Sequence, residues 1–433
     1  MKRSSENILF YGVAGSPILH SKSPQLFSLF SNERASLGHY GRFLIKTEEE
    51  LRYLLSHFPL QGLNITSPLK EKALGCADTC EKEAKIIGAA NLLVREEKGW
   101  RAYNTDYTAL RLLIGKTGVS AGSSVLIAGA GGAARAAALA ARDLNFSVTL
   151  TNRTEEKGRR TASELGIRFQ PWDESRKAFP LMITALPGQA DALSDHKEFD
   201  GIIIDAAYPS SKTTREASKR GLYVLSGEEW LIEQGKASYA IMTGFQPSEE
   251  DISSGRLKSI SLPGLPVILC GFMGSGKTAT GYHLKKKGMS LYSTDNELSK
   301  RAGSSVHEAF RALGEGKFRR MEAEIVGEGA LFGFDVIDSG GGLWMDSDLH
   351  NIIPAGVSVF FLWNTPEKAA ERGQNRPLIQ GKSIDSVKKR YEERLPVYFS
   401  LSDAVLLSDL LHPDEMARRI DSEMKTIQKL IDS

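Results

Sequence analysis

Short apolar runs alternate with segments of helical periodicity along most of the 433-residue chain. Each run is rich in Val, Ile and Leu and is bounded by polar or glycine-rich residues, which is typical of buried strands in a parallel sheet. Strands are predicted at residues 8–14, 63–66, 125–128, 148–151, 181–184, 201–205, 267–270 and 357–362. Because strands alternate with helical segments, the pattern predicts an α/β fold with parallel sheets.

The alternation lapses between residues 246 and 264, where Gly, Pro, Ser and acidic residues replace the apolar runs. Such a composition indicates a linker, and a chain of this length exceeds the usual size of one hydrophobic core. A second junction is expected at residues 118–122. We therefore predict two lobes at residues 1–118 and 119–245, with the chain then returning to the first lobe, and a separate domain at residues 265–433.

The composition argues against nucleic-acid-binding, membrane and secreted proteins. The chain is 41% hydrophobic and 25% charged, and its formal net charge of +2 gives no argument for binding nucleic acid or an anionic membrane. No run approaches the roughly 18 apolar residues of a membrane span, and the first residues lack a secretory signal pattern. Three cysteines cannot build a disulfide framework. These features predict a cytoplasmic protein, and they leave its oligomeric state open.

A first glycine loop follows the predicted strand at 125–128 and precedes an alanine-rich helical segment. Glycines at these positions permit a tight turn and let backbone N–H groups approach a pyrophosphate at the positive end of the helix. The residues concerned are Gly129, Gly131, Gly132 and Ala133. A strand before the loop and a helix after it predict a dinucleotide-binding (Rossmann) lobe.

The end of the next strand predicts which dinucleotide binds. An NAD site usually has an acidic residue there, to bond the ribose 2′-hydroxyl. This chain instead has Asn152, Arg153 and Thr154, with Lys157 one turn further on. Hydrogen-bond donors and positive charge favour the 2′-phosphate of NADP(H), whereas the structural alternative is a turn with a solvated arginine.

A second glycine loop, at residues 271–278, fits the G-x-x-x-x-G-K-T pattern that cradles the phosphates of a nucleoside triphosphate. The residues expected to bind ATP are Gly271, Gly274, Ser275, Gly276, Lys277 and Thr278. Lys277 would reach the β- and γ-phosphates, and Thr278 would ligate Mg²⁺. The loop identifies a nucleotide-binding class but not the acceptor of the phosphoryl group.

Polar clusters in the first lobe carry a family resemblance. They are the Gly-x-Pro-Ile-x-His-Ser-x-Ser-Pro segment at 15–24, the Asn-x-Thr-x-Pro-x-Lys segment at 64–70 and Asn-Thr-Asp at 104–106. With the Gly-Ala-Gly-Gly-Ala loop, these motifs occur in the same order as in shikimate dehydrogenase, which the first 260 or so residues resemble.

The resemblance implies NADPH-dependent reduction of 3-dehydroshikimate to shikimate. Ser21 and Ser23 would hold the substrate carboxylate, and Lys70 would be the catalytic group, paired with Asp106. The residues that would bond the ring hydroxyls are Thr66, Asn91, Asp106 and Gln234. The chain departs from the family's pattern at Phe27-Ser28, Thr184-Ala185-Leu186 and Met242-Thr243-Gly244.

Residues 265–433 resemble shikimate kinase, again through ordered motifs: the phosphate loop, Gly-Glu-x-x-Phe-Arg-x-x-Glu at 314–322, a triple glycine at 340–342 and Arg-Pro-Leu at 376–378. By that likeness Arg319 and Arg394 would clamp the shikimate carboxylate as bidentate partners. Asp295 would bond the ring hydroxyls and accept the attacking proton, Gly341 would donate a backbone N–H to the substrate, and Arg376 would close over the phosphates.

One departure in this part concerns the metal. The family commonly has Asp-x-Asp after its second strand, whereas this chain reads Ser293-Thr294-Asp295. Asp338, two residues before the first glycine of the triple turn, is a candidate substitute for the missing carboxylate.

The sequence therefore predicts a bifunctional enzyme that reduces 3-dehydroshikimate with NADPH and then phosphorylates shikimate with MgATP. Two alternatives stay open. One is an NAD-linked quinate/shikimate dehydrogenase, which Arg153 argues against. The other is a ligand-sensing protein with an inactive kinase half, which the missing Asp favours and the retained Lys277 and Asp295 oppose.

Overall fold

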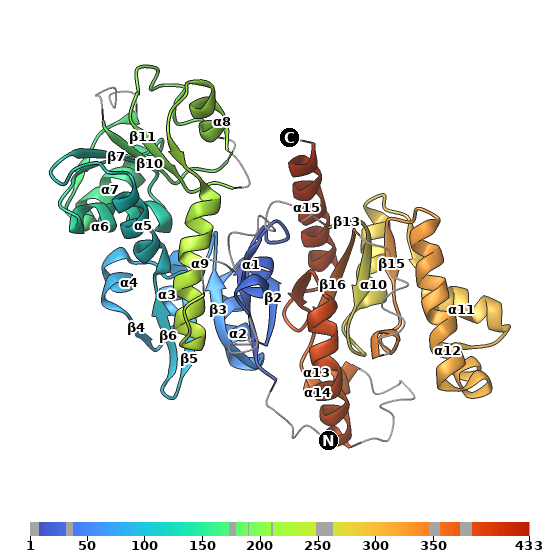
Figure 1. The fold of residues 1–433 in the computed structure, drawn as a ribbon. Helices are drawn as coiled ribbons and strands as arrows, with labels where there is room; N and C mark the ends of the chain where they lie inside the picture. Colours follow the sequence, from blue (N-terminus) through green and yellow to red (C-terminus); the bar gives the residue numbers. More distant parts are fainter. Residues whose placement is uncertain are drawn as a thin grey trace. The chain divides into compact units, whose positions relative to one another are not determined.

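The computed structural model describes residues 8–31, 38–172, 179–188, 190–208, 211–247, 263–345, 356–372 and 383–432. Their contacts divide the chain into two compact units (Figure 1). Unit 1 comprises Met1–Pro24, Gly38–Leu60 and Gly255–Ser433, and unit 2 comprises Gln25–Leu37 and Gln61–Ser254. Unit 1 thus joins N-terminal and C-terminal segments. The linear boundaries given above stay a prediction, and most of the predicted linker, residues 248–262, lies outside the described residues.

Unit 1 is built on a parallel sheet with the strand order β14-β15-β13-β16-β17-β2-β1. Its strands are β1 (Phe10–Gly15), β2 (His39–Leu44), β13 (Gly264–Cys270), β14 (Leu291–Ser293), β15 (Val336–Asp338), β16 (Val357–Trp363) and β17 (Ala404–Leu407). Its helices are α2 (Glu48–His57), α10 (Lys277–Lys286), α11 (Thr294–Ala302), α12 (Val306–Leu331), the short 3₁₀ helix η2 (Leu343–Met345), α13 (Pro366–Arg372), α14 (Ile384–Leu401) and α15 (Pro413–Ile431).

One hydrophobic core runs through unit 1. Val13, Ile18 and Leu44 from the N-terminal segments are fully or almost fully buried in the same cluster as Leu269, Phe360, Leu406 and Ile420 from the C-terminal segments. Near-continuous apolar strands fit this position, because a parallel sheet covered on both faces has no solvent-facing side.

Unit 2 contains a six-stranded parallel sheet with the order β12-β11-β10-β7-β8-β9 and a smaller mixed set of strands, β3-β5-β6-β4. The strands are β3 (Leu60–Ile65), β4 (Thr79–Cys80), β5 (Leu92–Glu96), β6 (Gly99–Tyr103), β7 (Ser124–Ala128), β8 (Ser147–Thr151), β9 (Arg168–Phe169), β10 (Leu181–Thr184), β11 (Ile202–Asp205) and β12 (Val224–Leu225). The helices are α1 (Ser23–Phe30, which begins at the unit boundary), α3 (Lys70–Gly75), α4 (Lys82–Ile87), α5 (Thr105–Lys116), α6 (Gly132–Asp143), α7 (Glu155–Leu165), α8 (Lys212–Lys219) and α9 (Gly227–Thr243).

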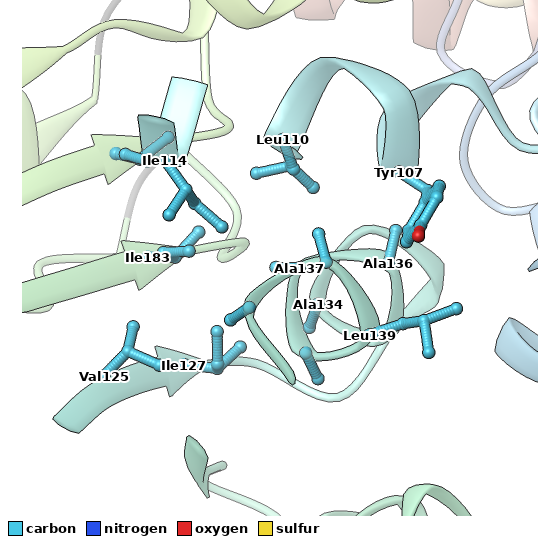
Figure 2. Packing of buried hydrophobic residues seen from close by; sticks show 14 of the residues in the cluster. Tyr107, Leu110, Ile114, Val125, Ile127, Ala134, Ala136, Ala137, Leu139 and Ile183 are labelled. Atoms are coloured by element: carbon cyan, nitrogen blue, oxygen red, sulfur yellow. The ribbon is translucent and has the colours of Figure 1, made fainter. Parts of the chain in front are cut away.

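The alanine-rich α6 forms the centre of the unit 2 core. Its small side chains, among them Ala134 and Ala137, pack against Leu110 of α5 and Ile127 of β7 (Figure 2). Alanine leaves little bulk between backbones, so the helix and the neighbouring elements approach closely. This packing fixes the start of α6 directly beside the end of β7.

The α/β fold with parallel-rich sheets confirms the fold class predicted from the sequence. In the part of the chain that the structure describes, no helix combines the length and apolar character needed to cross a membrane.

Candidate active sites

The ammonium of Lys70 and the carboxylate of Asp106 form an ion pair in unit 2. Lys70 Nζ donates to Asp106 Oδ2 at 2.5 Å, and the two side chains are 21% and 5% exposed. The other carboxylate oxygen, Oδ1, accepts from Trp230 Nε1 at 3.0 Å. Lys70 is the first residue of α3, and Asp106 lies in the first turn of α5. The lysine charge is therefore held at one place and stays partly accessible.

A buried polar network surrounds this pair. The side-chain amide of Asn91 donates to Thr105 Oγ1 at 3.0 Å and to Gln234 Oε1 at 3.4 Å, and its Oδ1 accepts from the Thr105 N–H at 2.7 Å. Ser238 on α9 accepts from Asn64 at 2.9 Å. Thr66 follows β3 directly and is half-buried. The structure thus brings together Asn91 and Gln234, two of the predicted substrate ligands, with Thr105 and Ser238 as further members of the network.

Ser21 and Ser23 lie in unit 1, whereas Lys70 lies in unit 2. Both are buried, and Ser21 Oγ donates to Ser23 Oγ at 3.2 Å. The Ser21 carbonyl accepts from Nε and Nη2 of Arg42 at 2.9 and 2.7 Å. The two hydroxyls lie side by side, an arrangement suited to the two oxygens of a carboxylate.

The first glycine loop has the geometry of a phosphate cradle. Gly129 has a φ of +123°, and a Cβ at this position would come 2.9 Å from the carbonyl oxygen of Ala185. Gly131 is the N-cap of α6 and provides no side-chain bond to the first amides of the helix. A Cβ on Gly132 would come 3.2 Å from the Cβ of Lys70. The loop, completed by Ala133 in the first turn of α6, therefore presents helix amides next to the lysine, as a bound pyrophosphate requires.

The end of β8 carries the groups expected for a 2′-phosphate. Arg153 and Thr154 are exposed, and Asn152 Nδ2 donates to the Thr154 carbonyl at 2.8 Å. Lys157 Nζ lies 3.9 Å from Glu71 Oε1. Donors and positive charge at a strand end fit a phosphate monoester better than a ribose hydroxyl.

The second glycine loop connects β13 to α10 in unit 1. Gly271, Gly274 and Gly276 have φ values of +148°, +74° and +83°, and a Cβ on Gly271 would come 2.6 Å from the Leu362 carbonyl oxygen. The buried hydroxyl of Ser275 has no hydrogen-bond partner among the described residues. Lys277 Nζ donates to the carbonyls of Gly271 and Phe272 at 3.0 and 3.2 Å. This loop fits the phosphates of a nucleotide.

A pocket of about 410 Å³ lies beside this loop. It is lined by Gly274, Ser275, Gly276, Arg372, Ser408, Asp409, Leu410, Leu411, His412, Pro413 and Met416. Arg372 donates to the Ser408 carbonyl at 3.1 Å. The pocket shares Gly274, Ser275 and Gly276 with the loop, so it adjoins the candidate phosphate cradle.

A cluster of charged groups forms the candidate acceptor site of unit 1. Arg319 Nη1 donates to the buried carboxylate of Glu322 at 2.5 Å. Burial raises the pKa of Glu322 above its ordinary value, and the nearby positive charges of Arg319 and Arg394 oppose that rise. The guanidinium of Arg394 lies 5.7 Å from the centre of the Phe272 ring. Two arginines thus gather around one buried acid, which leaves positive charge for a carboxylate substrate.

The glycines of the triple turn leave room for this cluster. A Cβ on Gly342 would overlap the Arg319 guanidinium, and one on Gly340 would overlap the Glu322 carboxylate. The carbonyl of Gly341 accepts from the hydroxyl of the buried Tyr398. A side chain at Gly340 or Gly342 would therefore displace the end of Glu322 or Arg319 from its present place.

Asp338 lies beside Ser293, which stands where the family commonly has the first Asp of Asp-x-Asp. In the parallel sheet, Asp338 of β15 is paired with Ser293 of β14 on one side and with Leu269 of β13 on the other. Asp295 is exposed in the first turn of α11, and Thr294 Oγ1 donates to the Asp338 carbonyl at 2.8 Å. The described residues contain no cluster of three or more His, Cys, Asp or Glu side chains able to hold a metal ion. Thr278 and Asp338 carry side-chain oxygens of the kind that Mg²⁺ binds.

Several site features escaped the sequence. Trp230 orients Asp106 from α9, Glu322 partners Arg319, and Tyr398 contacts Gly341. Among these, Glu322 carried a signal, because it is the last residue of the Gly-Glu-x-x-Phe-Arg-x-x-Glu motif at 314–322. Arg376 lies outside the described residues.

Comparison with known proteins finds the two families that the sequence resembles. A model of the shikimate dehydrogenase substrate binding domain matches residues 13–93, and a model of shikimate kinase matches residues 273–425. A shikimate dehydrogenase (NADP(+)) of an Anaeromyxobacter species (strain K) is 31% identical over 267 residues, which cover 56% of this chain and 94% of the relative.

Two solved structures are similar in fold. One is a shikimate dehydrogenase in complex with NADP+, with a TM-score of 0.54 and 26% identity, covering 58% of this chain and 96% of that one. The other is the enzyme from Thermus thermophilus in complex with NADP(H) and shikimate, with a TM-score of 0.51 and 28% identity, covering 58% and 100%.

Fold and sites together define an α/β enzyme with one cradle for a dinucleotide and another for a nucleoside triphosphate. The chain belongs to the shikimate dehydrogenase family and carries a shikimate kinase domain in its C-terminal part.

Proposed function

We propose that this chain catalyses two consecutive reactions on one carbon skeleton. The first is the NADPH-dependent reduction of 3-dehydroshikimate to shikimate, and the second is the phosphorylation of the shikimate 3-hydroxyl by MgATP. The observation that carries the first reaction is the Lys70–Asp106 pair at 2.5 Å, placed against Gly132 of the dinucleotide loop.

In the reduction, the negative charge that develops on the substrate's carbonyl oxygen needs a nearby cation and a proton. Lys70 supplies both, because its ammonium is held by Asp106 and remains 21% exposed. When bound, NADPH supplies the hydride. Asn91 and Gln234 would bond the ring hydroxyls, and Ser21 and Ser23 would bond the carboxylate.

In the phosphorylation, the protein mainly positions the reactants and stabilises charge. Arg319 and Arg394 would clamp the shikimate carboxylate, and Asp295 would accept the proton of the attacking hydroxyl. Lys277 would move from the loop carbonyls that it now contacts to the phosphates of ATP. Thr278 would ligate Mg²⁺, with Asp338 as the second oxygen ligand.

A coupled assay tests both reactions. Purified full-length protein receives 3-dehydroshikimate, NADPH and MgATP, and the loss of NADPH absorbance and the release of ADP are followed together. We expect NADPH loss to begin at once and ADP release to follow as shikimate forms. Intact 3-dehydroshikimate would refute the first activity. Shikimate that accumulates without ADP release would refute the second and leave the ligand-sensing alternative for the kinase half.

The cofactor separates the proposal from an NAD-linked quinate/shikimate dehydrogenase. Arg153 at the end of β8 supports NADPH, and the related protein from Anaeromyxobacter is named as NADP(+)-dependent. Equal turnover with NADH would contradict the NADP preference. We also place the protein in the cytoplasm, with small shikimate-related molecules as its substrates.

A further inference from the structure

The carboxylate of Glu423, on the C-terminal helix α15, holds the backbone of a loop near the start of the chain. Its two oxygens accept from the N–H of Ile18 at 3.2 and 3.0 Å, and Oε2 also accepts from the N–H of Leu19 at 3.0 Å. Glu423 is 2% exposed, and Ile18 and Leu19 are fully buried. A buried carboxylate bonded to two backbone amides is a strong, directional contact.

The loop that Glu423 holds is the one that carries Ser21 and Ser23. The Ser21 N–H donates to the Ile18 carbonyl at 2.9 Å, which closes a tight turn, and the Ser21 hydroxyl lies 3.2 Å from that of Ser23. The two serines therefore take their positions from the turn whose first amides bond Glu423.

A second contact from the kinase domain supports the same loop. Arg42 of β2 bonds the Ser21 carbonyl through two nitrogens, and its Nη1 donates to the Asp403 carbonyl at 3.4 Å. Asp403 directly precedes β17 and accepts from the Val359 N–H at 2.8 Å. The turn is thus bonded directly by Glu423 and indirectly by Asp403, and both residues belong to the C-terminal part of the chain.

We propose that Glu423 is a positioning residue of the dehydrogenase reaction, supplied by the shikimate kinase domain, which sets the Ser21 and Ser23 hydroxyls for the carboxylate of 3-dehydroshikimate. The inference rests on the proposed dehydrogenase function. It goes beyond that function because it makes the affinity of the first site depend on a side chain of the other catalytic domain.

The substitution Glu423→Gln tests this role with little change in shape. The substitution removes the negative charge and turns one acceptor oxygen into an NH₂ donor that faces the loop amides, so the charge-assisted bonds to Ile18 and Leu19 weaken and the turn relaxes. We expect the KM for 3-dehydroshikimate to rise about tenfold, equivalent to about 1.4 kcal/mol of binding. We expect kcat at saturating substrate, the KM for NADPH and the kinase activity to change less than about twofold, because Lys70 and both nucleotide sites are untouched.

Two control variants separate positioning from general loosening of the helix. Asp421→Asn removes an acidic group of α15 that pairs with Lys425 and does not contact the loop. Arg419→Lys weakens the other buried tie of α15, the bidentate pair with Glu50, and leaves the loop bonds in place. We expect neither variant to raise the KM for 3-dehydroshikimate. A rise in Arg419→Lys equal to that in Glu423→Gln would overturn the proposal in favour of a structural role.

Hydrogen exchange supplies a readout that does not depend on turnover. In Glu423→Gln, the amides of a peptide covering residues 13–24 should exchange faster than in the wild type, whereas peptides from α6 should not change. Faster exchange with an unchanged KM would overturn the proposal, and so would unchanged exchange. A wild-type protein that cannot reduce 3-dehydroshikimate would instead refute the proposed function, and the exchange result would still report whether the contact exists.

Discussion

At the scale of single residues, the position of the Lys70 ammonium depends on the hydrogen bonds that Asp106 accepts. Asp106 contributes one oxygen to Lys70 and the other to the indole of Trp230, and Asp106 itself is 5% exposed. A carboxylate held on both sides fixes the direction in which the ammonium points. In the proposed mechanism, this charge would be preorganised for the substrate oxygen that becomes negative during the reduction.

Replacing Lys70 with Met should affect the chemical step. We expect kcat for the reduction to fall by about a hundredfold or more, while the KM for 3-dehydroshikimate changes less than about threefold, since the other proposed ligands remain. Steady-state kinetics with NADPH oxidation as the signal measure both constants. Lys72→Met, on the exposed side of the same short helix, is the matched control and should behave as the wild type. A Lys70 variant with normal kcat would exclude the lysine as the catalytic group.

Replacing Asp338 with Asn should affect only the second reaction. The register of β14 and β15 places Asp338 opposite Ser293, where a metal-side carboxylate is missing from the sequence. We expect the Mg²⁺ concentration for half-maximal kinase activity to rise about tenfold, by analogy with the loss of one charged oxygen ligand. The dehydrogenase activity of the same preparation is the control for folding. An unchanged Mg²⁺ requirement would remove Asp338 from the metal site.

At the scale of secondary-structure elements, helix α15 is tied to α2 by a buried ion pair. Arg419 donates from both terminal nitrogens to Glu50 at 2.8 and 2.7 Å, and the two side chains are 5% and 7% exposed. Burial alone would raise the pKa of Glu50, but the bonds from Arg419 and from the Lys46 N–H outweigh it, so this pKa lies below its ordinary value. Glu50 is therefore charged and paired at neutral pH.

Breaking this pair should destabilise unit 1. Arg419→Met leaves Glu50 buried without its cation, and we expect a loss of about 3–5 kcal/mol in the free energy of unfolding at neutral pH. Arg418→Met, which replaces the exposed arginine at the preceding position of the same helix, is the control and should change stability by less than about 0.5 kcal/mol. Chemical denaturation curves measure both values.

The effect of pH on this pair follows from the lowered pKa of Glu50. A carboxyl whose pKa is lower in the folded state stabilises the fold above its unfolded pKa, and this contribution is lost as the pH falls through the folded value. The stability difference between wild type and Arg419→Met should therefore shrink at pH values below the ordinary pKa of 4.5. A difference that stays constant into acid would contradict the charge pairing.

At the scale of the whole molecule, the dehydrogenase and kinase sequences share one hydrophobic core. Unit 1 takes β1, β2 and α2 from the dehydrogenase sequence and packs them into the core of the kinase sheet. The ring of Phe399 on α14 lies 5.4 Å from Phe10 and 5.5 Å from Phe43. Burial of each such aliphatic or aromatic side chain stabilises by about 1.5–3 kcal/mol.

Cutting the chain should therefore cost stability on both sides. We expect a fragment ending at residue 254 and a fragment starting at residue 255 each to melt at a lower temperature than the full chain, because the core of unit 1 is divided between them. Expressed together, they should co-purify and regain part of that stability. Calorimetry measures the melting temperatures, and size-exclusion chromatography shows whether the two fragments elute together. Two fragments that stay apart and melt as the full chain does would show that the shared core is dispensable.

Many of the strands could be predicted from the sequence, because their apolar runs differ clearly from the polar residues on either side. Residues 181–184 coincide with β10, and the run at 125–128 lies within β7, which starts one residue earlier. The strands β2 and β17 were not predicted. In β2 the sequence His-Tyr-Gly-Arg-Phe-Leu contains too few apolar residues to stand out. The strand is buried because it pairs with β1 and β17 and because Phe399 packs on Gly41.

The departure at Phe27 illustrates how tertiary packing explains a local oddity. Phe27 stands where the family usually has a polar residue, and no neighbouring residue in the sequence accounts for it. In the structure Phe27 is 1% exposed, and its ring lies 6.0 Å from that of Tyr239 on α9. The aromatic ring fills the contact between α1 and α9, so the change concerns packing.

The sequence by itself determined the chemistry of both halves, because a phosphate cradle is made from consecutive residues whose glycines and lysine must stand at fixed spacings. Lys70 and Arg319 were predicted as site residues in the same way, from local motifs. Only the tertiary structure decided which distant residues complete them: Trp230 on Asp106, and Glu423 on the amides of Ile18 and Leu19. Such contacts depend on how helices pack across hundreds of residues, and packing leaves no fixed spacing in the chain.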